Sequence, residues 1–342
     1  MDDATRPRQR APTLKTIAGL TDLAVPTVSR ALSGALDISE DTRARVRAVA
    51  DEIGYVPNRA GVRLRTGRTN VISLVMSTEH DIMNHTAKLI SSVSAGLRNT
   101  PFHLIITPYF PDEDPMKPIR YIVESRSADA VIFNQIQPQD PRVRYLLDRK
   151  FPFATHGRSN WAKDHAWFDF DNFAYGRIAV ETLAARGRRH LLLVPPPDKQ
   201  SYGQEMIAGC SDTARRLGID LQIVVGFDSD SAIEDVQRGV SDLLDRQPAP
   251  DGIITGSTNS ALGAGAALRT GGIAIGRDID VFTKEAMVFL RRVWPEILTV
   301  SENVVAAGDF LARAAIAQVT HPKEDLMQKL DAPTWQLDDE AS

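Results

Sequence analysis

From Val71 onward, short apolar segments alternate with amphipathic helical patterns, and this alternation constrains the fold more than any other feature. Helical spacing is clearest in residues 84–98, 173–186, 202–217, 233–246 and 304–319. Strands are expected at residues 71–76, 102–107, 129–133, 151–155, 190–194, 221–225, 251–255, 279–283 and 297–301. Apolar strands that alternate with helices are typical of parallel sheets covered on both faces. Nine strands exceed the need of one compact half, so we expect two doubly wound parallel sheets in two lobes, with a break near residues 166–172.

The first 58 residues show a different pattern of apolar and polar residues, which predicts three short helices. Thr13 is a suitable N-cap for a helix over residues 14–20, and a turn at Thr21 and Asp22 leads into a second helix over residues 23–32. A third helix is expected between the N-cap Ser39 and the C-cap Gly54. These helices are expected to form a small all-α bundle.

Charge is distributed unevenly between the two ends of the chain. Residues 1–70 carry 12 Lys and Arg against 8 Asp and Glu, a net +4, whereas the whole chain has a net charge of -4. Residues 55–70 contain several Arg and no acidic residue, which is typical of a basic linker. Basic residues therefore gather at the amino end, as expected for a phosphate-containing partner.

The stretch "LAVPTVSRAL" at residues 23–32 carries the chemistry of a DNA-reading helix. A helix, a tight turn and a second helix can place that second helix in the major groove. Hydroxyl groups on Thr27 and Ser29 can donate to phosphate oxygens, and Arg30 can bond guanine in two ways. Val25 and Pro26 can make only apolar contact, for instance with a thymine methyl group.

Four segments in a fixed order resemble the start of the lactose-repressor (LacI/GalR) family: "TLKTIA", "PTVSRAL", "ISEDTRARV" and "GYVPN". The remainder resembles that family's two-lobed, periplasmic-binding-protein-like effector domain, most clearly at "FDFDN" and "ILTVSENVVAAGDFLARAAI". The resemblance implies a helix-turn-helix headpiece over residues 1–58, a hinge linker over 59–70 and an effector-binding and dimerisation domain over 71–342.

The resemblance also implies which residues contact DNA. Leu64 holds the position of a hinge leucine that wedges into the minor groove, which bends the duplex. Asp22 replaces a usual Gly in the turn, and Ala24 replaces a usual Ser at the N-cap of the second helix, which costs roughly 1 kcal/mol. The implied DNA-binding residues are Leu14, Lys15, Val25, Pro26, Thr27, Ser29, Arg30, Asn58 and Leu64.

Two open α/β lobes direct the carboxyl ends of their strands toward a shared cleft, where ligands bind. Polar residues follow the expected strands, and Trp161 and Trp167 offer flat aromatic surfaces. Such groups suit a sugar or polyol, because each buried hydroxyl needs a partner. Met206 stands where many family members have an Arg, which argues against an anionic ligand. The candidate effector-binding residues are His85, Asn134, His156, Arg158, Asp171, Asn172, Asn259, Lys284 and Glu285.

The sequence offers little support for an enzymatic function. No phosphate-binding loop, nucleophile elbow or dinucleotide fingerprint is present, no cofactor is expected, and no histidine pair has a metal-ligand spacing such as HExxH. No run of about 18 apolar residues predicts a membrane span, and a cytoplasmic location is expected. The sequence thus predicts a homodimeric, DNA-binding transcriptional regulator, more specifically a repressor, that responds to a small molecule.

The alternative is a two-lobed sugar-binding protein or sugar-active enzyme with no DNA function. Lys284 and Glu285 are a candidate acid–base pair for such an enzyme, although neighbours at a strand end usually point to different faces. The sequence leaves open the identity of the effector, its effect on DNA affinity, the operator, and the choice between dimer and tetramer.

Overall fold

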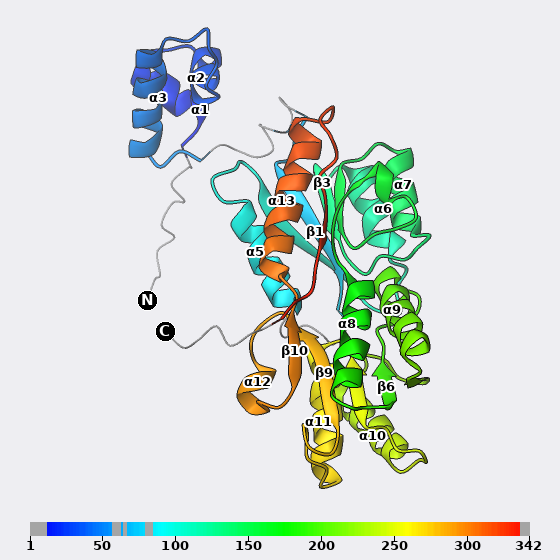
Figure 1. The fold of residues 1–342 in the computed structure, drawn as a ribbon. Helices are drawn as coiled ribbons and strands as arrows, with labels where there is room; N and C mark the ends of the chain where they lie inside the picture. The colour runs from blue at the N-terminus through cyan, green and yellow to red at the C-terminus, as the bar shows by residue number, and fades with distance from the viewer. Residues whose placement is uncertain (1–11, 57–62, 64–66, 79–84, 336–342) are drawn as a thin grey trace, which may run out of the picture. The chain divides into compact units, whose positions relative to one another are not determined.

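The computed structural model describes residues 12–56, 63, 67–78 and 85–335. The chain divides into two compact units, Met1–Thr69 and Asn70–Ser342 (Figure 1). Asn58 and Leu64, which the sequence assigns to DNA binding, lie outside the described residues.

The first unit contains three helices among its described residues: α1 (Leu14–Thr21), α2 (Val25–Leu32) and α3 (Glu40–Glu52). Each helix contributes apolar side chains to one small core. The buried members of this core are Ile17, Val28, Ala31, Val46 and Ala50. The three predicted helices are confirmed, with α2 beginning two residues later than expected.

Capping explains where these helices begin and end. Thr13 forms a capping box with Thr16, and the Ser39 side chain accepts a hydrogen bond from the Thr42 amide. Asp22 adopts the left-handed conformation with φ 52°, which Asp tolerates better than most residues. Ala24 provides no side-chain cap for α2, as its methyl group requires.

The second unit contains two six-stranded sheets, each forming one lobe. In the first sheet the strand order is β11-β5-β4-β3-β1-β2. Helices α5 (Ala87–Gly96) and α13 (Val304–Thr320) lie side by side on one face, and α6 (Met116–Ser125) and α7 (Pro141–Asp148) lie on the other (Figure 1). The strands are β1 (Val71–Ser77), β2 (His103–Tyr109), β3 (Ala130–Phe133), β4 (Phe153–His156), β5 (Ala166–Phe170) and β11 (Gln328–Asp331).

The second sheet has the order β12-β10-β9-β8-β6-β7. Its strands are β6 (His190–Val194), β7 (Asp220–Ile223), β8 (Gly252–Thr255), β9 (Asp280–Glu285), β10 (Leu298–Ser301) and β12 (Thr334–Trp335). Its helices are α8 (Asn172–Ala185), α9 (Ser201–Leu217), α10 (Ile233–Leu244), α11 (Thr258–Thr270) and the short α12 (Leu290–Val293). Separate apolar cores lie under the α8–α9 pair and under the α10–α11 pair.

Two predictions about the sheets need correction. Residues 166–170, expected to lie at the break between lobes, form the buried strand β5 of the first sheet, and the chain crosses only after them. The sheets are parallel except for β12, which pairs antiparallel with β10. Strand β11 was not predicted, because it has only 4 residues, most of them polar, and pairs with β5 at the edge of the sheet.

Close approach of α5 and α13 depends on glycine. A Cβ atom on Gly308 would lie 1.9 Å from Ser92 Oγ, and one on Gly96 would lie 2.8 Å from Ala312 Cβ. Ser92 Oγ also donates to the Val304 carbonyl at 3.1 Å. This tight contact holds α13 against the first lobe, where the chain has returned from the second, and fixes the segment that precedes α13.

Among the described residues, no helix is long and apolar enough to cross a membrane.

Candidate functional site

The first unit presents one face of α2 to solvent. Pro26 and Arg30 are exposed, Val25, Thr27 and Ser29 are half-buried, and the opposite face is buried through Val28 and Ala31. At the start of α1, Lys15 is exposed and Leu14 is half-buried. The seven described residues that the sequence assigns to DNA contact therefore keep surface available, while the helix is held from behind.

Arginine side chains of α2 and α3 connect these helices and the segments next to them. Arg30 forms an ion pair with Asp37, which follows α2. From α3, Arg45 donates to the Thr21 carbonyl and Arg43 donates to the Gly34 and Ala35 carbonyls. Both sides of the Arg30 pair are about half exposed, so the guanidinium can exchange Asp37 for another acceptor at little cost.

The second unit contains a cavity at the carboxyl ends of strands from both sheets, where α/β folds bind ligands. Lining residues come from the ends of β1, β3, β4 and β5 in one lobe and of β8, β9 and β10 in the other. They include Ser77, Asn134, His156, Asp169, Tyr202, Asp230, Ser257, Lys284, Glu285 and Glu302. Most are polar.

Six of the nine candidate effector residues line this cavity: His85, Asn134, His156, Asn172, Lys284 and Glu285. The other three do not. Arg158 is held by carboxylates, Asp171 accepts a hydrogen bond from Ala174 as the N-cap of α8, and Asn259 lies in the first turn of α11. Trp161 packs against the first-lobe core, and the Trp167 indole donates to the Ala162 carbonyl, so neither lines the cavity.

Several residues that line the cavity were not predicted from the sequence. Asp169 and Glu302 each lie at a strand end, a signal that was present, but the first was assigned to the break between lobes. Tyr202 and Asp230 come from the start of α9 and from a loop, where no strand end marks them. Their side chains form a hydrogen bond at 3.4 Å.

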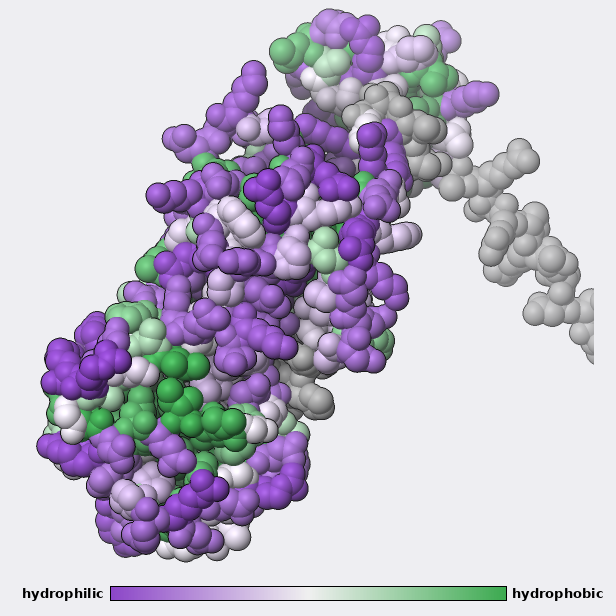
Figure 2. All heavy atoms as spheres, turned by 90° about the vertical axis from the view of Figure 1, so that its right-hand side faces the viewer, coloured by the Kyte–Doolittle hydropathy of each residue, from purple (hydrophilic) through white to green (hydrophobic). Residues whose placement is uncertain are grey.

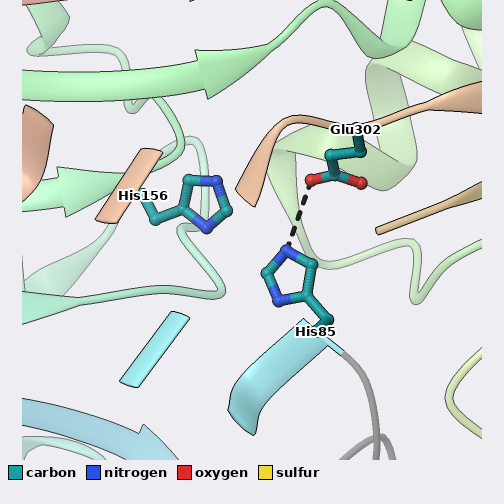
Figure 3. A group of neighbouring side chains, drawn as sticks. All are labelled: His85, His156 and Glu302. Carbon is teal, nitrogen blue, oxygen red and sulfur yellow. Dashed lines mark hydrogen bonds and ion pairs between the residues drawn. The ribbon is translucent and has the colours of Figure 1, made fainter. Parts of the chain in front are cut away.

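Charged groups form a connected cluster on one wall of the cavity. Lys284 Nζ lies 2.9 Å from Glu302 Oε2 and 3.1 Å from Asn172 Oδ1. His85 Nε2 lies 3.3 Å from Glu302 Oε1, and the His85 ring stacks on that of His156 (Figure 3). Burial opposes ionisation of Glu302, but the charge of Lys284 and the hydrogen bond with His85 outweigh it and hold the pKa of that carboxyl well below its usual value.

His156 behaves as a neutral imidazole. Burial, assisted by the neighbouring His85, lowers its pKa to about 3. Asn134 Oδ1 is buried and has no hydrogen-bond partner among the described residues. The cavity thus combines neutral and charged groups that can donate to or accept from hydroxyl groups.

A second ion-pair group joins the lobes beside the cavity. Arg158, after β4, donates to Asp169 at 2.7 Å and to both carboxylate oxygens of Glu205 on α9, at 2.8 and 2.9 Å. Burial raises the pKa of Asp169 to about 7, although Arg158 opposes this shift. Arg158 therefore supports a wall of the cavity and links first-lobe and second-lobe elements.

These features define a class of protein: a helix-turn-helix unit followed by a two-lobed α/β body with a polar cavity at its strand ends. Residues 13–58 match the model for bacterial regulatory proteins of the lacI family, and residues 180–341 match a periplasmic binding protein-like domain. The chain is 30% identical over 325 residues to the HTH-type transcriptional regulator AglR of Rhizobium meliloti (strain 1021), covering 92% of this chain and 90% of that protein.

Two solved structures share the fold. The lac repressor dimer bound to operator and the anti-inducer ONPF has a TM-score of 0.81 at 18% identity and covers 95% of this chain and 97% of that one. The complex of the transcriptional regulator CelR with cellobiose has a TM-score of 0.69 at 21% identity, covering 95% and 98%. The chain belongs to the LacI family: it is a DNA-binding transcriptional regulator, not an enzyme.

Proposed function

We propose that the protein is a cytoplasmic repressor whose affinity for a pseudo-palindromic operator is controlled by a sugar or polyol. Its headpiece would span residues 1–58, its hinge 59–70 and its sensing body 71–342. The observation that carries the proposal is the exposure pattern of α2: Val28 is buried on one face, and Pro26 and Arg30 are exposed on the other. A helix held in this way can enter the major groove without rearranging its own core.

The lining of the cavity supports a polyhydroxylated effector. Asn134, Asn172 and Lys284 offer donors and acceptors at short range, and Tyr202 and Phe170 offer apolar ring surface. Met206, at the position where an Arg would bind an anion, is fully buried in the second-lobe core and adds no charge. A neutral sugar fits this set better than an organic acid, and the cellobiose complex of CelR is consistent with this choice.

A homodimer is supported by exposed apolar side chains on edge strand β2. Ile105 and Ile106 are 45% and 43% exposed, and β2 lies at the open edge of the first sheet. In the second lobe, Met287, Val288, Phe289 and Val293 are also exposed, at and just before α12. Figure 2 faces the side of the body away from α12, and that side is mostly hydrophilic, with a separate apolar area on the second lobe. A twofold pairing of such patches would place two identical headpieces on mirrored half-sites.

Fluorescence anisotropy with promoter fragments tests the proposal. The wild type is expected to bind with an affinity that falls steeply as salt rises, because counterions are released from the DNA. Arg30→Ala is expected to lose roughly 1–3 kcal/mol of discrimination between operator and unrelated DNA. Arg215→Ala, which removes an exposed arginine from α9, is the matched control. Salt-independent binding, or equal behaviour of the two variants, would contradict the proposal.

The effector is identified by a thermal-shift screen of sugars and sugar phosphates. A ligand that binds only the native state raises the melting temperature with concentration. Neutral sugars are expected to give the shift, and Asn134→Ala is expected to reduce it. A shift produced only by sugar phosphates would overturn the neutral-effector part of the proposal and leave DNA binding intact.

A further inference from the structure

Two histidines and a glutamate from three separate segments meet on one wall of the cavity (Figure 3). His85 lies two residues before the start of α5, His156 ends β4, and Glu302 follows β10. The three positions are far apart in the chain, so no short sequence motif could reveal them. The fold alone brings them together.

The geometry of this cluster is close to that of a metal site. Each residue offers one ligand atom, and the three atoms all lie within 4.8 Å of one another. Ligand atoms around a tetrahedral zinc ion, with bonds of about 2.0–2.2 Å, are about 3.4 Å apart. The His85 Nε2 to Glu302 Oε1 distance is already 3.3 Å, so the remaining separations need to shorten by no more than about 1.4 Å. Small side-chain rotations supply such a change.

The donor types suit a borderline divalent ion such as Zn2+. Two imidazoles and one carboxylate are the protein ligands of many catalytic zinc sites, which keep one position open. The two carboxylate oxygens of Glu302 are divided between neighbours, because Oε2 pairs with Lys284 and Oε1 faces His85. The oxygen on the histidine side can therefore bind an ion while Lys284 retains its own partner.

We propose that His85, His156 and Glu302 bind a divalent transition-metal ion of the zinc type, with one coordination position open to the cavity. The open position would accept an oxygen of a small ligand. Metal binding would be an additional property of the cavity proposed to bind sugar, and it can be measured without DNA or sugar. Lys284 places a positive charge beside the site, so its ammonium group weakens metal binding by electrostatic repulsion.

The repulsion from Lys284 makes the proposal testable in two directions. Loss of a ligand should weaken metal binding, whereas loss of the nearby ammonium should strengthen it. A cluster that serves only as hydrogen-bond partner for sugar hydroxyls would show neither effect in the absence of sugar. Damage to the fold would weaken binding in every variant and could not produce the gain.

The experiment uses the full chain after treatment with a chelator and removal of that chelator. Calorimetric titration with ZnCl2 is expected to show one ion per chain, and CoCl2 is expected to give the visible absorption of tetrahedral Co2+. His156→Gln is expected to weaken binding at least tenfold. His103→Gln, which removes an exposed histidine on β2, is the matched control and should leave the affinity unchanged.

Lys284→Met is expected to strengthen zinc binding several-fold relative to the wild type. Circular dichroism establishes that each variant is folded, and the Lys284→Met result decides the question if His156→Gln does not fold. Absence of saturable binding in the wild type would overturn the proposal. So would equal losses in His156→Gln and His103→Gln, or weaker binding by Lys284→Met. None of these readouts uses operator DNA, so the outcome is distinguishable from failure of the proposed repressor function.

Discussion

Asp169 is a buried carboxylate with a perturbed pKa at the edge of the cavity. It is 5% exposed, and burial raises its pKa to about 7 although Arg158 lies 2.7 Å away. Because the folded-state pKa is raised, this group adds stability at low pH, and that stability is lost as pH rises through about 7. A single residue thus makes the stability of the sensing body depend on pH near neutrality.

Asp169→Asn removes this titration while keeping an oxygen that can accept from Arg158. The stability of the wild type relative to the variant is expected to fall as pH rises between the unfolded and folded pKa values, by up to about 1.4 kcal/mol per pH unit. Urea unfolding of both proteins at a series of pH values across this window measures the difference. Parallel pH profiles for the two proteins would show that Asp169 does not titrate there.

Among the elements, α2 is a DNA-reading helix that begins without a side-chain cap. Its N-cap is Ala24, and Pro26 in the first turn has no amide hydrogen, so the Thr27 amide is the donor that a cap would satisfy. Ala24→Ser is expected to stabilise the helix by about 0.5–1 kcal/mol. Hydrogen exchange at the Thr27 amide should slow accordingly.

Thr13→Ala is the control of opposite sign, because Thr13 caps α1 through a capping box. It is expected to speed exchange in the first turn of α1 by a similar free energy. If Ala24→Ser leaves exchange in α2 unchanged, packing rather than capping sets the stability of that helix end.

Elements encoded by local signals were predictable from the sequence, and those that depend on distant partners were not. Thr13 and Ser39 mark helix starts through hydrogen bonds within three residues, and β1 and β6 are continuous apolar runs. By contrast, β11 has no local signal, since it is polar and forms only by pairing with β5.

The same distinction applies to the cavity. His156 and Lys284 were predictable because parallel strands end at one edge. Arg158 also follows a strand, but two carboxylates hold its side chain, and one of them, Glu205, comes from the other lobe. The position of a residue after a strand predicts that it lies near the cleft, but its charged neighbours in the folded protein determine whether its side chain lines the cavity.

At the scale of the whole sensing body, the lobes are linked by repeated crossings of the chain. The chain passes to the second lobe after β5, returns before α13, and passes again between β11 and β12. Glu302 lies on the second of these crossings and Asn172 directly after the first. A ligand that contacts both residues would prefer one lobe arrangement, and an effector can shift an equilibrium only through such differential binding.

The proposed dimer brings together the β2 edges of two chains. Ile106 is exposed on this edge strand, and in a twofold interface one substitution places two charges in the same contact. Ile106→Glu is therefore expected to halve the mass measured by light scattering and to weaken operator binding at least tenfold, because the two headpieces no longer act together. Tyr121→Glu, at an apolar residue of α6 that is 66% exposed, is the matched control and should remain dimeric. A dimeric Ile106→Glu variant, or a monomeric Tyr121→Glu variant, would move the interface away from β2 and leave its exposed isoleucines without a partner.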